Sequence, residues 1–121
     1  MKIRTRFAPS PTGFLHIGGL RTALYNYVFS KKNNGEFILR IEDTDQKRLV
    51  KSATSKIINS LQSFNIEFDE GPNINEIYGP YKQSERLEIY QSHYIKLIEN
   101  NFAYLCYIDK NEELIPENKI D

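Results

Sequence analysis

Strand-like and helix-like segments alternate along the first hundred residues, and this alternation constrains the possible folds more than any other feature of the sequence. Residues 3–8 alternate apolar and polar side chains, and residues 36–42 are almost continuously apolar, as in a strand that is buried on both faces. Apolar residues spaced three and four apart predict helices at residues 18–33, 53–65 and 85–100. A further strand is expected over residues 102–108. Strands that alternate with helices form parallel sheets, so the predicted fold class is α/β.

Length and cysteine content narrow the class of protein further. The 121 residues make one domain at most, and no apolar run approaches the roughly 18–20 residues that cross a bilayer. The single cysteine, Cys106, excludes an internal disulfide and a zinc site built on paired cysteines. No apolar signal segment follows the charged N-terminus. We therefore expect a cytoplasmic protein with no membrane partner.

Charge is distributed unevenly along the chain, although the formal net charge is zero. Residues 1–35 carry six basic side chains and no acidic one, whereas residues 99–121 carry six acidic and two basic ones. A basic N-terminal segment suits an anionic ligand such as a nucleotide or a nucleic acid. A basic face that is merely solvated explains the same pattern equally well.

The connection between the first strand and the first helix contains the residues best suited to ligand binding. Residues 9–13 (Pro-Ser-Pro-Thr-Gly) exclude regular structure, and His16 lies about two residues before the expected helix. Unpaired backbone N–H groups at a helix start attract phosphate, and an imidazole there adds a donor. Gly18 and Gly19 leave room for a flat ligand close to the backbone. A histidine at a helix start is also often a structural cap, so both interpretations remain open.

Four sequence blocks together resemble the glutamyl branch of the class I aminoacyl-tRNA synthetases. The first block, residues 6–19, resembles the His-Ile-Gly-His signature region of that class, with Gly19 in place of the last histidine. That replacement is common in the glutamyl branch. The other three blocks follow in the family's order: residues 40–45 (Arg-Ile-Glu-Asp-Thr-Asp), 69–72 (Asp-Glu-Gly-Pro) and 79–86 (Gly-Pro-Tyr-Lys-Gln-Ser-Glu-Arg).

The resemblance implies a fold, an activity and a set of ligands. The fold is a Rossmann-like parallel sheet with flanking helices, incomplete because the chain matches only the first half of a class I catalytic domain. Residues 1–82 correspond to that half, and residues 83–121 to a connecting helix, a strand and the opening of the acceptor-end-binding insertion. The implied activity is glutamate–tRNA ligase: ATP activates glutamate to glutamyl-adenylate, and the glutamyl group moves to the 3′ end of tRNA(Glu). Mg²⁺ accompanies ATP.

The resemblance also assigns roles to individual residues. His16 is the expected catalytic residue, because it contacts the ATP phosphates and stabilises developing charge. The expected ATP-binding residues are Pro11, Thr12, His16, Gly18 and Gly19. The expected glutamate-binding residues are Arg6, Ala8, Ser10 and Glu42. Arg6 pairs with a carboxylate, plausibly that of the substrate side chain, and Glu42 pairs with the α-ammonium group. Thr44 and Asp45 either contact the tRNA end or only order their loop.

Other features limit what this chain can do alone. Some relatives carry a Cys-x-Cys half of a zinc site near Cys106, but the second cysteine is missing, so we expect no zinc and a buried Cys106. The lysine-rich loop and the anticodon-binding domain of a full-length enzyme, expected to be a monomer, are missing as well. The 121-residue piece is therefore expected to be inactive in isolation. Two alternatives remain: a non-catalytic nucleotide- or RNA-binding fragment from a decayed gene, and a glutamyl-queuosine-tRNA synthetase-like enzyme.

Overall fold

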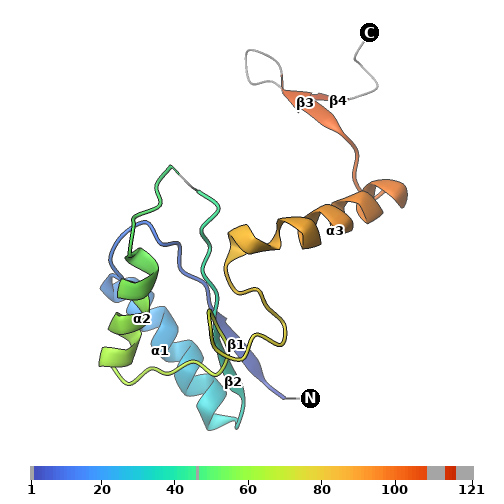
Figure 1. Cartoon of the computed structure of the whole chain (residues 1–121). Coiled ribbons are helices and arrows are strands. Elements are labelled where there is room, and N and C mark those ends of the chain that lie inside the picture. Colours follow the sequence, from blue (N-terminus) through green and yellow to red (C-terminus); the bar gives the residue numbers. More distant parts are fainter. Residues whose placement is uncertain (1, 46, 109–113, 117–121) are drawn as a thin grey trace. The chain divides into compact units, whose positions relative to one another are not determined.

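The computed structural model describes residues 2–45, 47–108 and 114–116, and it divides into two compact units (Figure 1). The first unit is Met1–Arg86 and the second is Leu87–Asp121. Each unit is described by itself below. Among the described residues, no helix is long and apolar enough to cross a membrane.

The first unit is built on a strand–helix–strand motif in which β1 (Arg4–Phe7), α1 (Ile17–Lys32) and β2 (Glu36–Leu39) follow one another. The two strands run parallel, and Arg4 lies opposite Glu36 in the register. The parallel pairing predicted from the alternation of strands and helices is therefore confirmed. The connection 8–16 leaves the carboxyl end of β1, which is where ligands of parallel sheets bind.

The segment 69–83, whose Gly71-Pro72 and Gly79-Pro80 pairs predict a loop, extends the sheet beyond β2. Ile38 forms a parallel bridge with Glu70, and Ile41 forms one with Lys82. β2 therefore lies between β1 and the chain segment 70–82, and its apolar residues Phe37, Ile38 and Leu39 are all buried, as its continuous apolar run predicts. On the other side, β1 pairs with no described strand except β2, as expected for an incomplete sheet.

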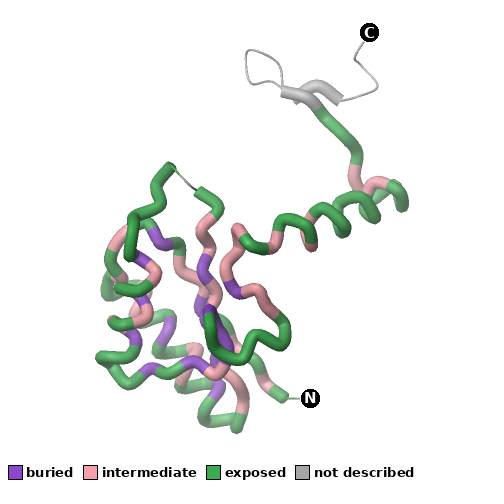
Figure 2. Tube along the Cα trace, in the orientation of Figure 1, coloured by how far each residue is buried: buried purple, intermediate pink, exposed green. Residues whose placement is uncertain are grey.

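The hydrophobic core lies between one face of the sheet and the helices α1 and α2 (Ala53–Ser63) (Figure 2). Its fully buried members come from all of these elements: Ala23, Phe37, Leu39, Ile41, Ile57 and Leu61. The expected apolar stripe of α1 is only partly correct, because Leu24 and Val28 are 48% and 52% exposed. The same apolar spacing places Phe64 on the inner face of the helix predicted at residues 53–65, but Phe64 is 60% exposed, which is a second correction.

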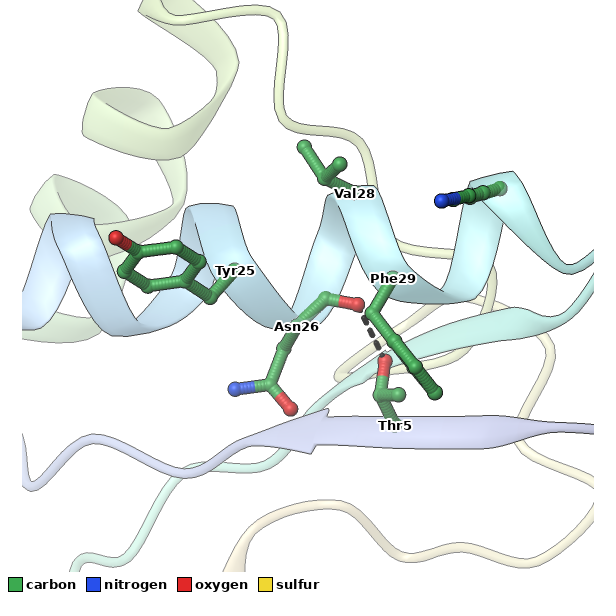
Figure 3. Close-up of a pocket in the computed structure, with 6 residues that line it drawn as sticks. Thr5, Tyr25, Asn26, Val28 and Phe29 are labelled. Atoms are coloured by element: carbon green, nitrogen blue, oxygen red, sulfur yellow. Dashed lines mark hydrogen bonds between the residues drawn. The ribbon is translucent and has the colours of Figure 1, made fainter.

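Helix α1 packs on β1 through its middle turns. The Thr5 hydroxyl on β1 donates a hydrogen bond to the Asn26 carbonyl oxygen at 2.8 Å (Figure 3). Tyr25, Val28 and Phe29 of α1 line a hollow of about 630 Å³ beside this contact. The apolar lining remains exposed because β1 has no described neighbour on this side.

In the second unit the helix expected over residues 85–100 is present, but the strand after it and the burial of its residues differ from the prediction. A 3-10 turn, η1 (Gln83–Arg86), closes the first unit, and α3 (Leu87–Glu99) then begins, with no buried residue and with Leu87 63% exposed. The strand expected over 102–108 is shorter and forms an antiparallel hairpin: β3 (Cys106–Ile108) pairs with β4 (Leu114–Pro116). Cys106 is exposed, so its expected burial is wrong, because the hairpin is not part of a covered sheet. Apart from β4, the expected polar tail 109–121 lies outside the described residues.

Candidate active site

A hollow of about 470 Å³ lies at the carboxyl end of β1. Its walls come from Phe7 at the end of β1, from the connection 9–16, from Gly19 in the first turn of α1 and from Ile57 on α2. Of the residues predicted to bind ATP, Thr12, His16 and Gly19 line this hollow, and so does Ser10 of the predicted glutamate set. The fold therefore gathers these residues around one concave site.

Two of the predicted ATP-binding residues do not line the hollow. Pro11 is fully buried behind it, and its carbonyl oxygen accepts a hydrogen bond from the Val50 N–H group at 3.1 Å. Gly18 is exposed on the first turn of α1. Pro11 thus fixes the shape of the connection through its rigid ring and its backbone contact.

His16 is the N-cap of α1, and its side chain shapes the start of the helix. Its Nδ1 atom accepts hydrogen bonds from the N–H groups of Gly18 and Gly19, at 3.1 and 3.4 Å. A neutral imidazole that accepts at Nδ1 carries its proton on Nε2. The exposed ring can therefore cap the helix and, at the same time, donate a hydrogen bond from Nε2 to an anion.

The two glycines have a local structural reason as well as the predicted functional one. A Cβ atom on Gly18 would lie 2.9 Å from Cε1 of His16, and one on Gly19 would lie 2.7 Å from Cδ1 of Leu15. Both distances are too short for unstrained packing. The glycines therefore leave space for the capping imidazole and for Leu15.

The other predicted glutamate-binding residues lie on the sheet face opposite α1. Thr5 and Phe7 face α1 and the core, so the alternation of side chains places Arg6 and Ala8 on the opposite face. On the next strand Phe37, Leu39 and Ile41 belong to the core, and the same alternation turns Glu42 toward the Arg6 side. The site therefore spans the carboxyl edge of the sheet and reaches both faces.

Arg6 and Glu42 lack partners in the part of the chain that the structure describes. The guanidinium of Arg6 is exposed, and the carboxylate of Glu42 is half-buried. Neither side chain takes part in an ion pair or hydrogen bond with a described residue. The backbone of Glu42 is fixed, because its N–H group donates to the Pro9 carbonyl oxygen at 3.0 Å. Opposite charges without partners on one face suit a zwitterionic ligand.

The loop after Glu42 binds back to the chain at two points. Asp43 accepts two hydrogen bonds from Ser84, one from its N–H group at 2.8 Å and one from its hydroxyl at 2.7 Å. Asp45 forms an ion pair with Arg48 at 2.5 Å, and this hydrogen bond lowers the pKa of Asp45 below its ordinary value. Thr44 is exposed between them. The geometry of Asp45 favours the interpretation in which it orders the loop.

A buried charge cluster near the amino end of the sheet was missed by sequence reasoning. Glu70 is only 1% exposed, and its carboxylate accepts two hydrogen bonds from Arg4, at 2.5 and 2.8 Å. The Tyr81 hydroxyl donates a further hydrogen bond to Glu70, and Arg4 also pairs with Glu36 at 2.7 Å. We call these four residues the Arg4 cluster. Its members are up to 77 positions apart along the chain (81 − 4 = 77), and no local pattern connects them.

The pKa shifts in the Arg4 cluster have clear causes. The hydrogen bonds from Arg4 lower the pKa of Glu70 below its ordinary value, against the effect of burial. Burial, together with the hydrogen bond to the Glu70 carboxylate, raises the pKa of Tyr81 to about 12. The same carboxylate raises the pKa of Arg4 further above neutrality. All three groups therefore keep their charge states at neutral pH and satisfy one another inside the fold.

The described residues contain no group of three or more histidine, cysteine or acidic side chains that could hold a metal ion. The lining of the hollow offers the hydroxyls of Ser10 and Thr12 but no carboxylate. A divalent cation at this site would therefore depend on ligands brought by a bound nucleotide.

Comparison with known proteins identifies the family. Residues 2–120 match the family model described as tRNA synthetases class I (E and Q), catalytic domain. Over 92% of its length the chain is 52% identical to the glutamate–tRNA ligase 2 of Fervidobacterium nodosum, and over 87% it is 59% identical to the mitochondrial glutamate–tRNA ligase of Schizosaccharomyces pombe. These matches cover only 24% and 20% of the two relatives.

Solved structures show the same relationship. The crystal structure of a glutamate tRNA ligase from Elizabethkingia meningosepticum, in complex with its amino acid, superimposes on 93% of this chain with a TM-score of 0.87 and 47% identity. The match covers 22% of that protein. The chain therefore spans about a quarter or less of the length of these relatives, and it belongs to the catalytic-domain family of the class I tRNA synthetases for glutamate and glutamine.

Proposed function

We propose that this chain is the N-terminal part of the catalytic domain of a glutamate–tRNA ligase. The enzyme would activate glutamate with ATP to form glutamyl-adenylate and transfer the glutamyl group to the 3′ end of tRNA(Glu). The observation that carries this proposal is the hollow at the carboxyl end of β1, with His16 at the helix start. Arg6 and Glu42, which have no partner among the described residues, lie at the same edge. We place the enzyme in the cytoplasm, as a monomer when full length.

ATP would occupy the hollow with its phosphates toward the start of α1. His16 presents its Nε2–H group there, and the positive end of the helix dipole adds to its effect. A carboxylate oxygen of glutamate attacks the α-phosphorus, and the bond to the leaving pyrophosphate breaks. No protein nucleophile takes part, so His16 contributes by stabilising charge that develops on the phosphate oxygens. Mg²⁺ would enter with ATP, held by phosphate oxygens and water.

Glutamate would bind at the carboxyl edge of the sheet between Arg6 and Glu42. The register places Arg6 beside Ile38, and the backbone pairing continues to Glu42 four positions further along. The two residues are thus separated by roughly 13 Å along the strands, at about 3.3 Å per residue. This gap leaves room for a small zwitterion between an Arg and a Glu side chain, with its side-chain carboxylate at Arg6 and its α-ammonium at Glu42. Ala8 and Ser10 lie between them in sequence.

The loop 43–45 would lie beside the 3′ end of tRNA. Asp45 already pairs with Arg48, whereas Thr44 is exposed and can contact a nucleotide without breaking an ion pair. We therefore assign Thr44 to the tRNA end and give Asp45 the task of shaping the loop.

The test is a chimera in which residues 1–121 replace the matching N-terminal segment of the Elizabethkingia meningosepticum ligase. The 47% identity and close superposition make this exchange feasible. We expect glutamate-dependent exchange between ATP and pyrophosphate, followed by charging of tRNA(Glu) at its 3′ end. The 121-residue chain alone should show neither activity. A folded chimera that binds ATP without exchange would support a non-catalytic fragment, and exchange without charging at the 3′ end would support the queuosine-related alternative.

A further inference from the structure

We propose that Asp43 is a positioning residue for glutamate binding, because it clamps the turn 79–84 onto the end of the central strand and so fixes the neighbouring Glu42. This inference rests on the proposed function, in which Glu42 binds the α-ammonium group. The inference is based on two hydrogen bonds that one carboxylate accepts. Asp43 Oδ1 accepts a hydrogen bond from the Ser84 N–H group, and Asp43 Oδ2 accepts one from the Ser84 hydroxyl.

Glu42 needs a neighbour that fixes its backbone, because no described residue bonds to its side chain. β2 ends at Leu39, so Glu42 lies beyond the regular strand. Among the described residues its carboxylate has no ion-pair or hydrogen-bond partner. Its position therefore depends on the backbone alone. A ligand that must meet this carboxylate in one geometry requires that backbone to be fixed before binding.

The backbone around Glu42 is fixed from two sides. On the β1 side, the Glu42 N–H group donates to the Pro9 carbonyl oxygen at 3.0 Å. On the other side, the Ile41 N–H group donates a hydrogen bond to the Tyr81 carbonyl oxygen. The Ile41 carbonyl oxygen accepts a hydrogen bond from the Gln83 N–H group, and both distances are 2.9 Å. The Asp43 clamp is the next contact on this second side. It joins the turn to the strand end at a second residue, in addition to the two backbone hydrogen bonds of Ile41.

An internal hydrogen bond closes the turn that Asp43 holds. The Arg86 guanidinium donates to the Pro80 carbonyl oxygen at 2.8 Å and so ties the end of η1 back to the start of the turn. Because the turn is closed in this way, the hydrogen bonds between Asp43 and Ser84 restrain the strand end as well as Ser84. Both oxygens of Asp43 accept hydrogen bonds, whereas the Glu42 carboxylate has no described partner. The two adjacent acids therefore have different roles: Asp43 fixes the backbone, and Glu42 binds the ligand.

The kinetic test uses the active chimera. Replacing Asp43 with alanine (D43A) should raise the KM for glutamate by about tenfold to a hundredfold, because a shift of about 1 Å at a binding group has an effect of this size. The KM for ATP should change less than about twofold. D43N should retain most of the affinity, because the Asn oxygen accepts the Ser84 N–H group and its amide donates to the Ser84 hydroxyl. The double variant D43A/S84A should be no worse than D43A.

Glu85→Ala is the matched control. Glu85 directly follows the turn in η1. Among the described residues its side chain makes only an exposed ion pair with Lys82 at 3.0 Å, so its removal should leave both KM values unchanged. A purely structural cap predicts a different result: D43A would lower stability and leave the KM for glutamate unaltered, or would raise both KM values equally. Either outcome overturns the proposal.

A second measurement needs no enzyme activity. In the 121-residue chain, D43A should speed hydrogen exchange at the amides of Glu42, Gln83 and Ser84 by about tenfold or more, as expected for local opening. D43N should protect these amides almost as well as Asp43 does. Unchanged exchange in D43A would refute the clamp. An inactive chimera combined with faster exchange in D43A would count against the proposed function and leave the clamp itself established.

Discussion

Arg4 and Arg6 lie two residues apart on the same face of β1, yet their surroundings are opposite. The Arg4 guanidinium pairs with Glu36 and with the buried Glu70, and it stacks on the Tyr78 ring at 4.7 Å. Arg6 has no described partner. The Arg4 cluster therefore satisfies its charges internally, whereas the carboxyl edge of the sheet keeps unpaired charges.

The difference separates structural charges from charges that are available to a ligand. Burial of an ionised group is costly unless a partner compensates for it, and Glu70 has two such partners. At the carboxyl edge, Arg6, Glu42 and Nε2 of His16 remain available. Substitutions in the two regions should therefore change different properties: stability near Arg4, and substrate use near Arg6.

The largest effect is expected from Glu70→Gln. It leaves Arg4 without its buried counter-charge, so the free energy of unfolding of the 121-residue chain should fall by about 2–4 kcal/mol. Urea denaturation followed by circular dichroism measures the change. If Arg6→Ala lowers the free energy of unfolding as much as Glu70→Gln, the contrast between the Arg4 cluster and the carboxyl edge is wrong.

The same variant should also alter the response to acid. The pKa of Glu70 is lowered in the folded state, so its contribution to stability is complete above its ordinary pKa of 4.5 and is lost as the pH falls below that value. Wild-type stability should therefore fall more steeply than that of Glu70→Gln below about pH 4.5. Parallel acid titrations of the two proteins would contradict this.

Substitutions of His16 test the carboxyl edge of the sheet, because two different substitutions separate its role as helix cap from its contact with phosphate. His16→Ala should lower kcat for ATP–pyrophosphate exchange in the chimera by about a hundredfold, the usual effect of losing one donor to developing charge, and it should also weaken α1. His16→Asn keeps a good N-cap but removes the outward Nε2–H group. It should retain thermal stability and still lose most of the activity. Full activity in His16→Asn would leave His16 with the structural role only.

Arg6→Ala should raise the KM for glutamate in the chimera by about tenfold to a hundredfold, the value of a charge-assisted hydrogen bond. The KM for ATP should change little, because Arg6 lies on the sheet face away from the hollow that His16 lines. Arg6→Lys keeps the charge but loses the planar fork, so we expect an intermediate value. Equal losses for glutamate and ATP would argue against the assignment of Arg6.

The smallest effect is expected from Tyr81→Phe, which removes one hydrogen bond to Glu70 and should cost about 1–2 kcal/mol of stability. Its signature appears at high pH. The pKa of Tyr81 is raised to about 12 from 10.0, so the unfolded chain ionises first and wild-type stability falls as the pH rises between these values. Tyr81→Phe should lack this part of the decline. Identical alkaline profiles would show that the Tyr81–Glu70 contact is unimportant.

Local pattern was sufficient for much of the first unit. Alternation of side chains located β1, three- and four-residue spacing located α1 and α2, and the sequence placed His16 close to the start of α1, where it is the N-cap. These features depend on neighbours within a few residues, so a single sequence contains them. The matching order of four sequence blocks identified the family, which the comparisons confirm.

Only the tertiary structure shows that residues of the same type, such as Arg4 and Arg6, have different roles. Nothing near Arg4 and Arg6 in sequence distinguishes them; Arg4 is set apart by Glu70, which lies 66 positions away in a segment without regular periodicity. The same holds for Asp43, whose partner Ser84 is 41 positions distant. Local periodicity reports which side of an element is apolar, but it does not report which distant group approaches it. Burial and charge pairing are set by that approach, and therefore only the folded chain could assign these roles.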